Sequence, residues 1–286
     1  MRRQGLVDSP GDIGLDGHAC WAYDDLTGDF LDAAVVFLTE GLDLGQALTF
    51  VGGPEAEEVV RTVDPLSGMV RDGTLEITPF ESVYPGSRLL SDREQWAVYE
   101  HALTEARAAG FTGLRVLAEV TCLAGPDGTW RAHAQFESYA DRRMAGSGLA
   151  ALCCFDRTAL PAEGLATIAS AHPVVDRRLA PQAPFRLFGR PDALALAGEV
   201  DAFSSATLRH LLRTPDDRLA PVLDLDELTF IEHTGVAALH EYAERARAGR
   251  PVRGARRPAH AATARRAARR LGLTVGRPAR VTAVPQ

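Results

Sequence analysis

The sequence lacks any apolar run long enough to cross a membrane. Apolar stretches such as residues 114–120 and 149–155 are far shorter than the roughly 20 residues that span a bilayer. Residues 1–17 also lack the apolar core of a secretory signal peptide. We therefore expect a cytoplasmic protein with no membrane segment, whose cysteines stay reduced.

Cysteine is scarce, and none of the four cysteines belongs to a C-x-x-C pair. Cys20 stands near His18, Cys122 follows an apolar run, and Cys153 and Cys154 are adjacent. Adjacent residues of a strand point to opposite faces, so the last two cannot together bind one tetrahedral metal ion. We predict no metal site and interpret the cysteines as buried thiols that act as small apolar side chains.

The sequence also has no lysine, and its arginines crowd into residues 245–280 although the formal net charge is -7. Paired arginines could bind nucleic acid through counterion release. The alternative is a solvated helix face with alanines packed inward, which we favour because no recognition motif accompanies the charges. We therefore do not expect a nucleic acid partner.

A chain of 286 residues exceeds the usual 100 to 200 residues of one domain and predicts two. In the N-terminal part, helical patterns alternate with short apolar strands. The predicted helices are 29–42, 94–109 and 132–144, and the predicted strands are 47–51, 74–77, 114–120 and 149–155. This alternation predicts an α/β fold with a mostly parallel sheet covered by helices.

Prolines and polar residues at 179–184 indicate a linker, so we place an N-terminal domain at 1–178 and a smaller α/β domain at 185–286. Its predicted strands are 185–188, 193–197 and 222–225, and its predicted helices are 204–213 and a later one that carries Val236, Leu239 and Ala243. Ser204 is the expected N-cap of the first helix.

The motif H-x-C-x-x-Y occurs at His18, Cys20 and Tyr23, just before the first predicted helix. Together with ALTFVG at 47–52, LRVLAEVT at 114–121 and ALCCFDR at 151–157, it resembles the MEDS family, the methanogen/methylotroph DcmR sensory domain. The resemblance implies a RecA-like sheet that senses a small molecule, hydrocarbon derivatives among them. We expect ligand-binding residues at His18, Cys20, Tyr23 and Glu119.

RecA-like folds often bind nucleotide through G-x-x-x-x-G-K-[ST] after the first core strand. We place that loop after the strand at 47–51, where the sequence reads Gly52, Gly53, Pro54 and then three glutamates within four residues. The lysine and the magnesium-binding hydroxyl are missing, and the carboxylates would repel a triphosphate. We predict no functional P-loop and no ATP hydrolysis.

The C-terminal part resembles the STAS family of sulphate transporters and anti-sigma factor antagonists. The resemblance rests on LAGEVD at 196–201, on VLDLDELTFIEHTGVAAL at 222–239 and, more weakly, on residues 253–273. It implies an anti-sigma factor or a HATPase-type kinase as partner. The partner-binding residues would be Asp201, Glu232, His233, Thr234 and Gly235.

In that family a loop of the form D-S-[ST]-G is phosphorylated on its first hydroxyl residue. His233 stands in that place here, so only Thr234 keeps a hydroxyl. A phosphate at this position would lie near a helix N-terminus, where backbone donors tolerate its charge. Thr234 is either a phosphosite or, in the interpretation that we favour, the N-cap of the following helix.

The sequence thus predicts a non-enzymatic regulator without cofactor or catalytic residues, in which a small-molecule sensor controls a protein-binding domain. The alternative is a thiol-dependent or metal-dependent enzyme that uses His18 and Cys20. A metal ion there would need further ligands, for which His133 and Cys122 are the candidates.

Overall fold

The computed structural model describes residues 2–125, 129–213, 222–249, 255–256 and 275–276. The chain divides into two compact units, Met1–Pro184 and Phe185–Gln286.

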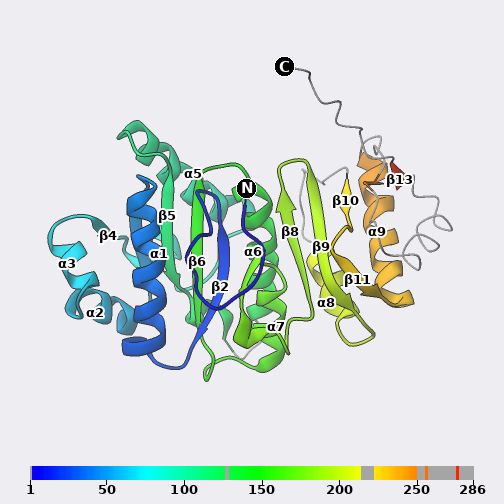
Figure 1. Ribbon diagram of the computed structural model, residues 1–286, viewed down its shortest axis with the longest axis horizontal. Coiled ribbons are helices and arrows are strands. Elements are labelled where there is room, and N and C mark those ends of the chain that lie inside the picture. The colour runs from blue at the N-terminus through cyan, green and yellow to red at the C-terminus, as the bar shows by residue number, and fades with distance from the viewer. Residues whose placement is uncertain (1, 126–128, 214–221, 250–254, 257–274, 277–286) are drawn as a thin grey trace, which may run out of the picture. The chain divides into compact units, whose positions relative to one another are not determined.

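The N-terminal unit is built on a seven-stranded sheet in which all neighbouring strands are parallel (Figure 1). The spatial order is β1-β7-β2-β6-β5-β3-β4. The strands are β1 (Gly5–Val7), β2 (His18–Tyr23), β3 (Ala47–Gly52), β4 (Leu75–Ile77), β5 (Leu114–Glu119), β6 (Leu149–Asp156) and β7 (Val174–Asp176). The predicted α/β fold with a parallel sheet is confirmed.

Helices cover both faces of this sheet (Figure 1). They are η1 (Leu26–Phe30), α1 (Leu31–Asp43), α2 (Pro54–Thr62), α3 (Leu66–Arg71), α4 (Phe80–Val83), α5 (Asp92–Ala108), η2 (Thr121–Ala124), α6 (Thr129–Met144), α7 (Ala162–Ala169) and η3 (Arg177–Leu179). Helices α1 to α3 share an apolar core with one face, whereas α5 and α6 cover the other.

Burial on both faces explains why the central strands are apolar along their whole length. Every residue of β5 is buried, and so are all residues of β6 except its last. On the α1 side, Phe37 and Leu38 of α1 belong to the same apolar core as Phe50 of β3, and all three side chains are 0% exposed. Removing any of these side chains would cost about 2 to 5 kcal/mol.

Strand β2 is the main departure from the sequence prediction, because the segment HACWAY has no regular pattern of apolar residues. It lies inside the sheet, between β7 and β6. As the first long strand of the core, it shifts the place of a P-loop to the segment that follows Tyr23. The predicted place after β3 is therefore wrong, although no lysine occurs at either position.

The C-terminal unit contains a small mixed sheet. Strands β8 (Phe185–Arg190) and β9 (Ala193–Val200) form an antiparallel pair, and β10 (Leu223–Asp224) and β11 (Leu228–Ile231) run parallel to β9. The remaining elements are α8 (Ser205–Leu212), α9 (His233–Gly249), β12 (Ala255–Arg256) and β13 (Val275–Gly276). Ser204 occupies the N-cap position of α8, but its side chain makes no capping bond; its hydroxyl donates instead to Asp201.

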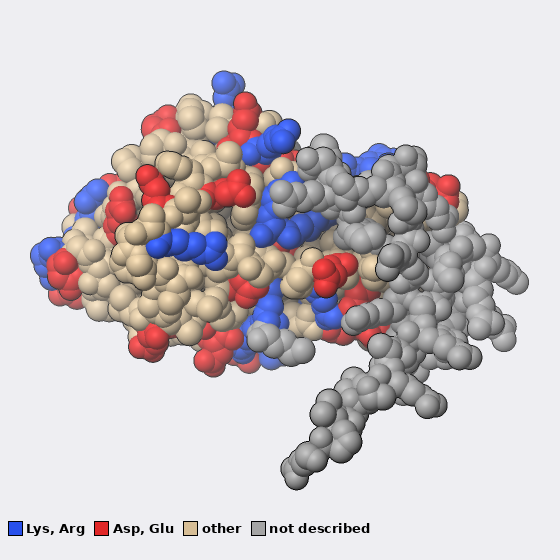
Figure 2. Space-filling model, turned by 90° about the horizontal axis from the view of Figure 1, so that it is seen from above, with Lys and Arg blue, Asp and Glu red and all other residues tan. Residues whose placement is uncertain are grey.

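Most of the arginine-rich segment 245–280 and most of the block 253–273 lie outside the described residues. On the face shown in Figure 2, acidic and basic side chains of the N-terminal unit are interspersed. Among the residues that the structure describes, no helix combines the length and apolar character needed to span a membrane.

Candidate functional site

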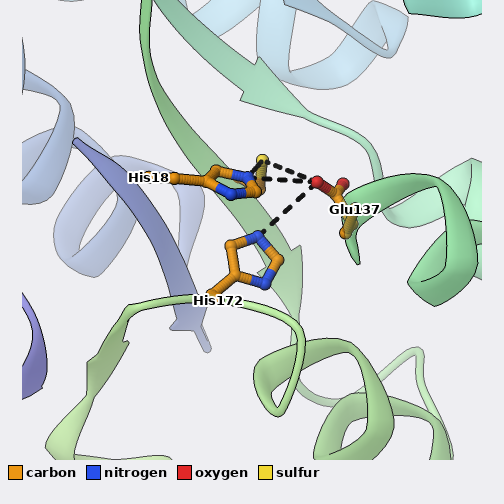
Figure 3. A group of neighbouring side chains, drawn as sticks. His18, Glu137 and His172 are labelled. Atoms are coloured by element: carbon orange, nitrogen blue, oxygen red, sulfur yellow. Dashed lines mark hydrogen bonds and ion pairs between the residues drawn. The ribbon is translucent and has the colours of Figure 1, made fainter. Parts of the chain in front are cut away.

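Four buried side chains that can bind a metal ion or form hydrogen bonds meet on the face of the sheet that α6 covers (Figure 3). His18 begins β2, Glu137 lies on α6, Cys153 lies on β6, and His172 precedes β7. All four side chains are buried, and one ligand atom of each lies within 4.8 Å of the others. Three chain segments far apart in sequence therefore converge with α6 on one point.

Glu137 is the centre of this cluster. Its Oε2 lies 3.1 Å from His18 Nε2, 3.6 Å from His172 Nε2 and 3.7 Å from Cys153 Sγ. The same sulfur lies 3.5 Å from His18 Nε2. On the next turn of α6, His133 Nε2 is 2.7 Å from Glu137 Oε1, in an orientation that does not meet hydrogen-bond geometry.

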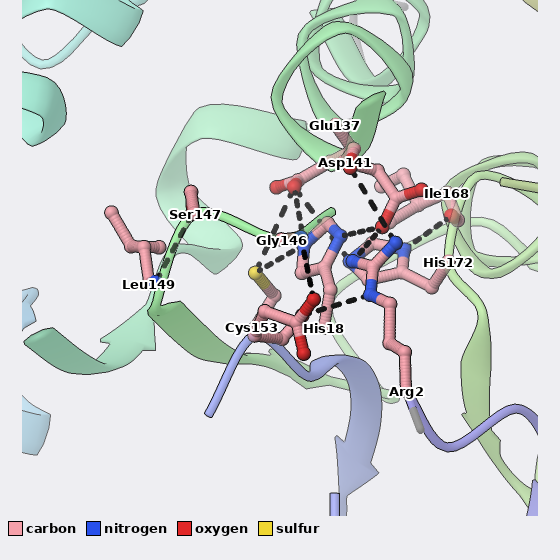
Figure 4. A network of polar contacts seen from close by, with 11 residues as sticks. Arg2, His18, Glu137, Asp141, Gly146, Ser147, Leu149, Cys153, Ile168 and His172 are labelled. Carbon is pink, nitrogen blue, oxygen red and sulfur yellow. Dashed lines mark hydrogen bonds and ion pairs between the residues drawn. The ribbon is translucent and has the colours of Figure 1, made fainter. Parts of the chain in front are cut away.

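A second layer of contacts fixes the two imidazole rings (Figure 4). His18 Nδ1 lies 3.0 Å from Asp141 Oδ1, and His172 Nδ1 lies 2.8 Å from the carbonyl oxygen of Ile168. A carboxylate and a carbonyl can only accept, so both Nδ1 atoms must donate. Arg2 binds the same Asp141 carboxylate from the N-terminal segment. Each ring therefore presents Nε2 to the cluster.

Burial and neighbouring charge set the protonation states. Burial lowers the pKa of His18, but its hydrogen bonds to Asp141 and Glu137 outweigh burial, and the net pKa is raised above its usual value. Burial and the nearby His18 lower the pKa of His172 to about 3. For Glu137, burial alone would raise the pKa, but the adjacent imidazoles of His133 and His18 hold it well below its usual value.

The arrangement pairs an ionised carboxylate with a charged His18, next to a neutral His172. Burial and the charge of Glu137 raise the pKa of the Cys153 thiol well above its usual value, so this sulfur is protonated. The Nε2 atom of His172 is buried and has no hydrogen-bond partner among the residues that the structure describes. The lone pair of His172 Nε2 therefore accepts no hydrogen bond from the described residues.

A small cavity of about 30 Å³ borders the cluster. His18, Glu137 and Cys153 form its polar end, and the rest is mostly aromatic and aliphatic. The aromatic lining consists of Tyr84, Trp96, Tyr99 and Phe136. A volume of this size holds about two water molecules, so the present conformation fits a ligand of only a few heavy atoms.

The structure separates the four residues predicted to bind ligand. His18 and Cys20 lie on the α6 face, and Cys20 is in register with Cys153 on the adjacent strand. Tyr23 lies on the other face, packed into the α1 core, and its hydroxyl donates to Glu119 at 3.0 Å. The four predicted residues therefore do not form one site: His18 and Cys20 lie on the α6 face, and Tyr23 and Glu119 lie on the α1 face.

The sequence pattern did not identify Glu137, Asp141, Cys153 or His172 as members of the site. Residues 133, 137 and 141 recur at intervals of four, which places them on one helix face, and this spacing was the available signal. Cys122, suggested as a fellow ligand of His18, is exposed on η2 and does not belong to the cluster.

In the C-terminal unit, the predicted switch loop joins β11 to α9. Glu232 donates its backbone N–H to the Val200 carbonyl at 2.9 Å, which places the loop beside the end of β9. Helix α9 begins at His233, so Thr234 lies within its first turn and is not the N-cap; its hydroxyl donates to the Glu232 carboxylate instead. His233 is exposed and Gly235 is buried.

A family model for the MEDS domain, the methanogen/methylotroph DcmR sensory domain, matches residues 17–173. The match includes the whole cluster except Arg2 and does not extend to the C-terminal unit. No curated protein matches the chain.

Proposed function

The chain belongs to the MEDS family of sensory domains, and from this premise we propose that it is a two-unit regulator: the N-terminal unit binds a small molecule, and the C-terminal unit binds a protein partner. Family membership indicates a signalling or regulatory role. The observation that carries the sensory half is the buried cluster of His18, Glu137 and Cys153 at the polar end of an aromatic cavity.

The cavity has the character of a small-molecule site, with an apolar lining and a few convergent polar groups. Its size favours ligands of one to three carbon atoms that carry one polar group. Such a ligand would place its carbon atoms against Tyr84 and Trp96 and its polar group against Glu137.

A ligand panel tests this assignment. Thermal unfolding of the full chain is measured with alcohols, amines and thiols of one to three carbons. We expect at least one compound to raise the Tm of the wild type, and Val116→Phe, which fills the cavity, to abolish the shift. Glu119→Gln, on the opposite face of the same strand, should retain it. A shift that survives Val116→Phe would place the ligand elsewhere.

Within the same proposal, the C-terminal unit is a STAS-like domain whose partner is an anti-sigma factor or a HATPase-type kinase. The end of β9 and the start of α9 carry exposed aromatic and polar side chains that could contact a partner protein. Phe203 is 91% exposed and follows β9, and Phe230 is 50% exposed on β11, the strand that leads into Glu232 and His233. Exposed aromatic side chains of this kind are typical anchors of protein interfaces.

Partner capture from native lysate tests this half, with the full chain as bait. We expect mass spectrometry to identify an anti-sigma factor or an ATPase-type kinase, and Thr234→Glu to reduce its recovery at least tenfold. Asp192→Asn, in the exposed turn at the other end of β9, should leave recovery unchanged. If neither class of protein is recovered, or if both variants behave alike, the assignment fails.

The proposed role is non-enzymatic. Burial raises the pKa of Cys20 well above its usual value, and the Cys20 side chain is 0% exposed. A protonated and shielded thiol is a poor nucleophile, which supports regulation over thiol catalysis. The segment after β2 contains Asp24 and Asp25 in place of a lysine, which supports a RecA-like sheet that does not bind a triphosphate.

A further inference from the structure

We propose that His18, Glu137, Cys153 and His172 form the binding site of one divalent transition-metal ion of the zinc class. The sequence pattern predicts no metal site, and the proposal rests instead on the spacing, orientation and burial of these four side chains. It does not depend on the proposed partner, but it shares His18, Glu137 and Cys153 with the proposed small-molecule site.

The separations of the ligand atoms fit one coordination sphere. Zinc bonds of about 2.0 Å to nitrogen or oxygen and about 2.3 Å to sulfur place tetrahedral ligand atoms about 3.3 to 3.6 Å apart. Four of the six separations among these atoms are 3.1 Å (His18 to Glu137), 3.5 Å (His18 to Cys153), 3.6 Å (His172 to Glu137) and 3.7 Å (Cys153 to Glu137). No separation exceeds 4.8 Å. An ion therefore fits after movements of about 1 Å or less.

The orientation of the rings fits as well. Metal-bound histidines almost always donate their second ring N–H to a carboxylate or a carbonyl. His18 donates to Asp141, which Arg2 also holds, and His172 donates to the carbonyl of Ile168. Both Nε2 atoms face Glu137 Oε2, and that of His172 has no hydrogen-bond partner within the described part of the chain.

The donor set identifies the class of ion. One thiolate, two imidazoles and one carboxylate combine soft and borderline ligands, which favour zinc over magnesium or calcium. Four protein ligands complete a tetrahedral shell, which is the pattern of a site that stabilises structure rather than one that keeps a position open for catalysis.

Charge is conserved when the ion binds. Without the ion, His18 Nε2 shares a proton with Glu137 Oε2 at 3.1 Å, and the Cys153 thiol donates to the same oxygen at 3.7 Å. The ion forms bonds to the two Nε2 atoms, the sulfur and the carboxylate, and the protons of His18 Nε2 and Cys153 Sγ leave to solvent. Two protons balance two positive charges, so the buried cluster keeps its net charge.

Cobalt titration of the full chain tests the site. After removal of metal with a chelator, we expect one Co²⁺ or Zn²⁺ per chain, with the intense visible bands of tetrahedral Co²⁺ and a near-ultraviolet charge-transfer band from thiolate to cobalt. Cys153→Ser should remove the charge-transfer band. Asp141→Asn, which loosens His18, should weaken binding by about 10-fold to 100-fold.

Two cysteine variants serve as controls. Cys154→Ala changes the adjacent buried cysteine on the opposite face of β6, and Cys122→Ser removes the exposed one. Both should bind one ion with unchanged spectra. The wild-type spectrum decides the proposal even if Cys153→Ser does not fold. A wild type that binds no ion, a cobalt spectrum without the thiolate band, or a band that disappears in Cys122→Ser would overturn it.

Discussion

Two buried charged clusters occupy opposite faces of the same sheet, and they differ in how completely their polar groups are paired. On the α1 face, Arg115 donates to Gln46 Oε1, to the carbonyls of Phe37 and Gly14, and to the Glu40 carboxylate, at 2.8 to 3.1 Å. On the α6 face, the cluster around Glu137 keeps an unbonded Nε2 on His172.

This difference separates a structural network from a binding site. A network in which every polar group has a hydrogen-bond partner stabilises one packing arrangement and leaves no group available to bind a ligand. A buried lone pair without a donor costs about 1 to 3 kcal/mol, which a bound cation or proton donor would recover. Both clusters contain charges inside the core, so burial of charge alone does not identify function.

The largest expected effect follows removal of Arg115. Arg115→Met should lower the free energy of unfolding by about 3 to 5 kcal/mol, because it leaves buried acceptors without donors. Arg61→Met, in an exposed ion pair with Glu57, should cost about 0.5 kcal/mol or less. Denaturant unfolding followed by tryptophan fluorescence measures both, since Trp21, Trp96 and Trp130 all lie in the N-terminal unit. Equal effects would remove the distinction between buried and exposed pairs.

Zinc should stabilise the protein through the cluster around Glu137 and not through the network around Arg115. At 100 to 1000 times its Kd, the ion should raise the free energy of unfolding of the stripped wild type by about 2.7 to 4.1 kcal/mol. The gain should persist in Arg115→Met, because that residue lies on the other face. It should be absent in His172→Phe, which removes one ligand. The same fluorescence titration, repeated with and without Zn²⁺, measures the gain, and an equal gain in His172→Phe would contradict the assignment.

In the absence of metal, His172→Phe should be far milder than Arg115→Met. The substitution removes the hydrogen bond to Ile168 and the 3.6 Å contact with Glu137, but it also eliminates the unbonded Nε2, so we expect a change of about 1 kcal/mol or less. Unfolding of the stripped variant gives the value. A loss comparable to that of Arg115→Met would show that His172 belongs to a closed structural network.

The smallest effect concerns a cysteine that belongs to neither cluster. The side chain of Cys122 is exposed, but neighbouring atoms partly desolvate its sulfur, and this desolvation together with the charge of Glu119 raises the pKa of Cys122 to about 11, so the thiolate fraction is small at neutral pH. Labelling of native protein by iodoacetamide should occur at Cys122 alone and accelerate about tenfold per pH unit between pH 7 and 9. Peptide mass spectrometry gives the site and the rate. Native labelling of Cys153 at a similar rate would mean that the cluster is open to solvent.

The sequence predicts the parts of the fold whose apolar pattern is regular. Strands β3, β5 and β6 are short apolar runs, and α1 and α5 have a clear amphipathic period, so all five were predicted close to their observed bounds. Strand β2 has no regular apolar pattern because its residues alternate between two buried environments: Ala19, Trp21 and Tyr23 enter the α1 core, whereas His18 and Cys20 lie on the α6 face, where His18 belongs to the polar cluster. Buried polar residues interrupt the apolar pattern by which a strand is predicted from hydropathy.

The candidate site was predictable only in part for the same reason. The H-x-C-x-x-Y motif led to His18, but a run of His133, Glu137 and Asp141 on one helix face has the pattern of a solvated surface. These three side chains are buried because α6 packs against both the sheet and α7. Only the fold brings Cys153 and His172 to the same point.

X-ray absorption at the zinc edge of the full chain, loaded with one equivalent of Zn²⁺, tests most directly the claim that the α6 face holds an open binding cluster. We predict one sulfur at about 2.3 Å and three nitrogen or oxygen atoms at about 2.0 to 2.1 Å, with imidazole scattering from two histidines. A shell of nitrogen and oxygen alone, or one with two or more sulfur atoms, would contradict the site built from His18, Glu137, Cys153 and His172.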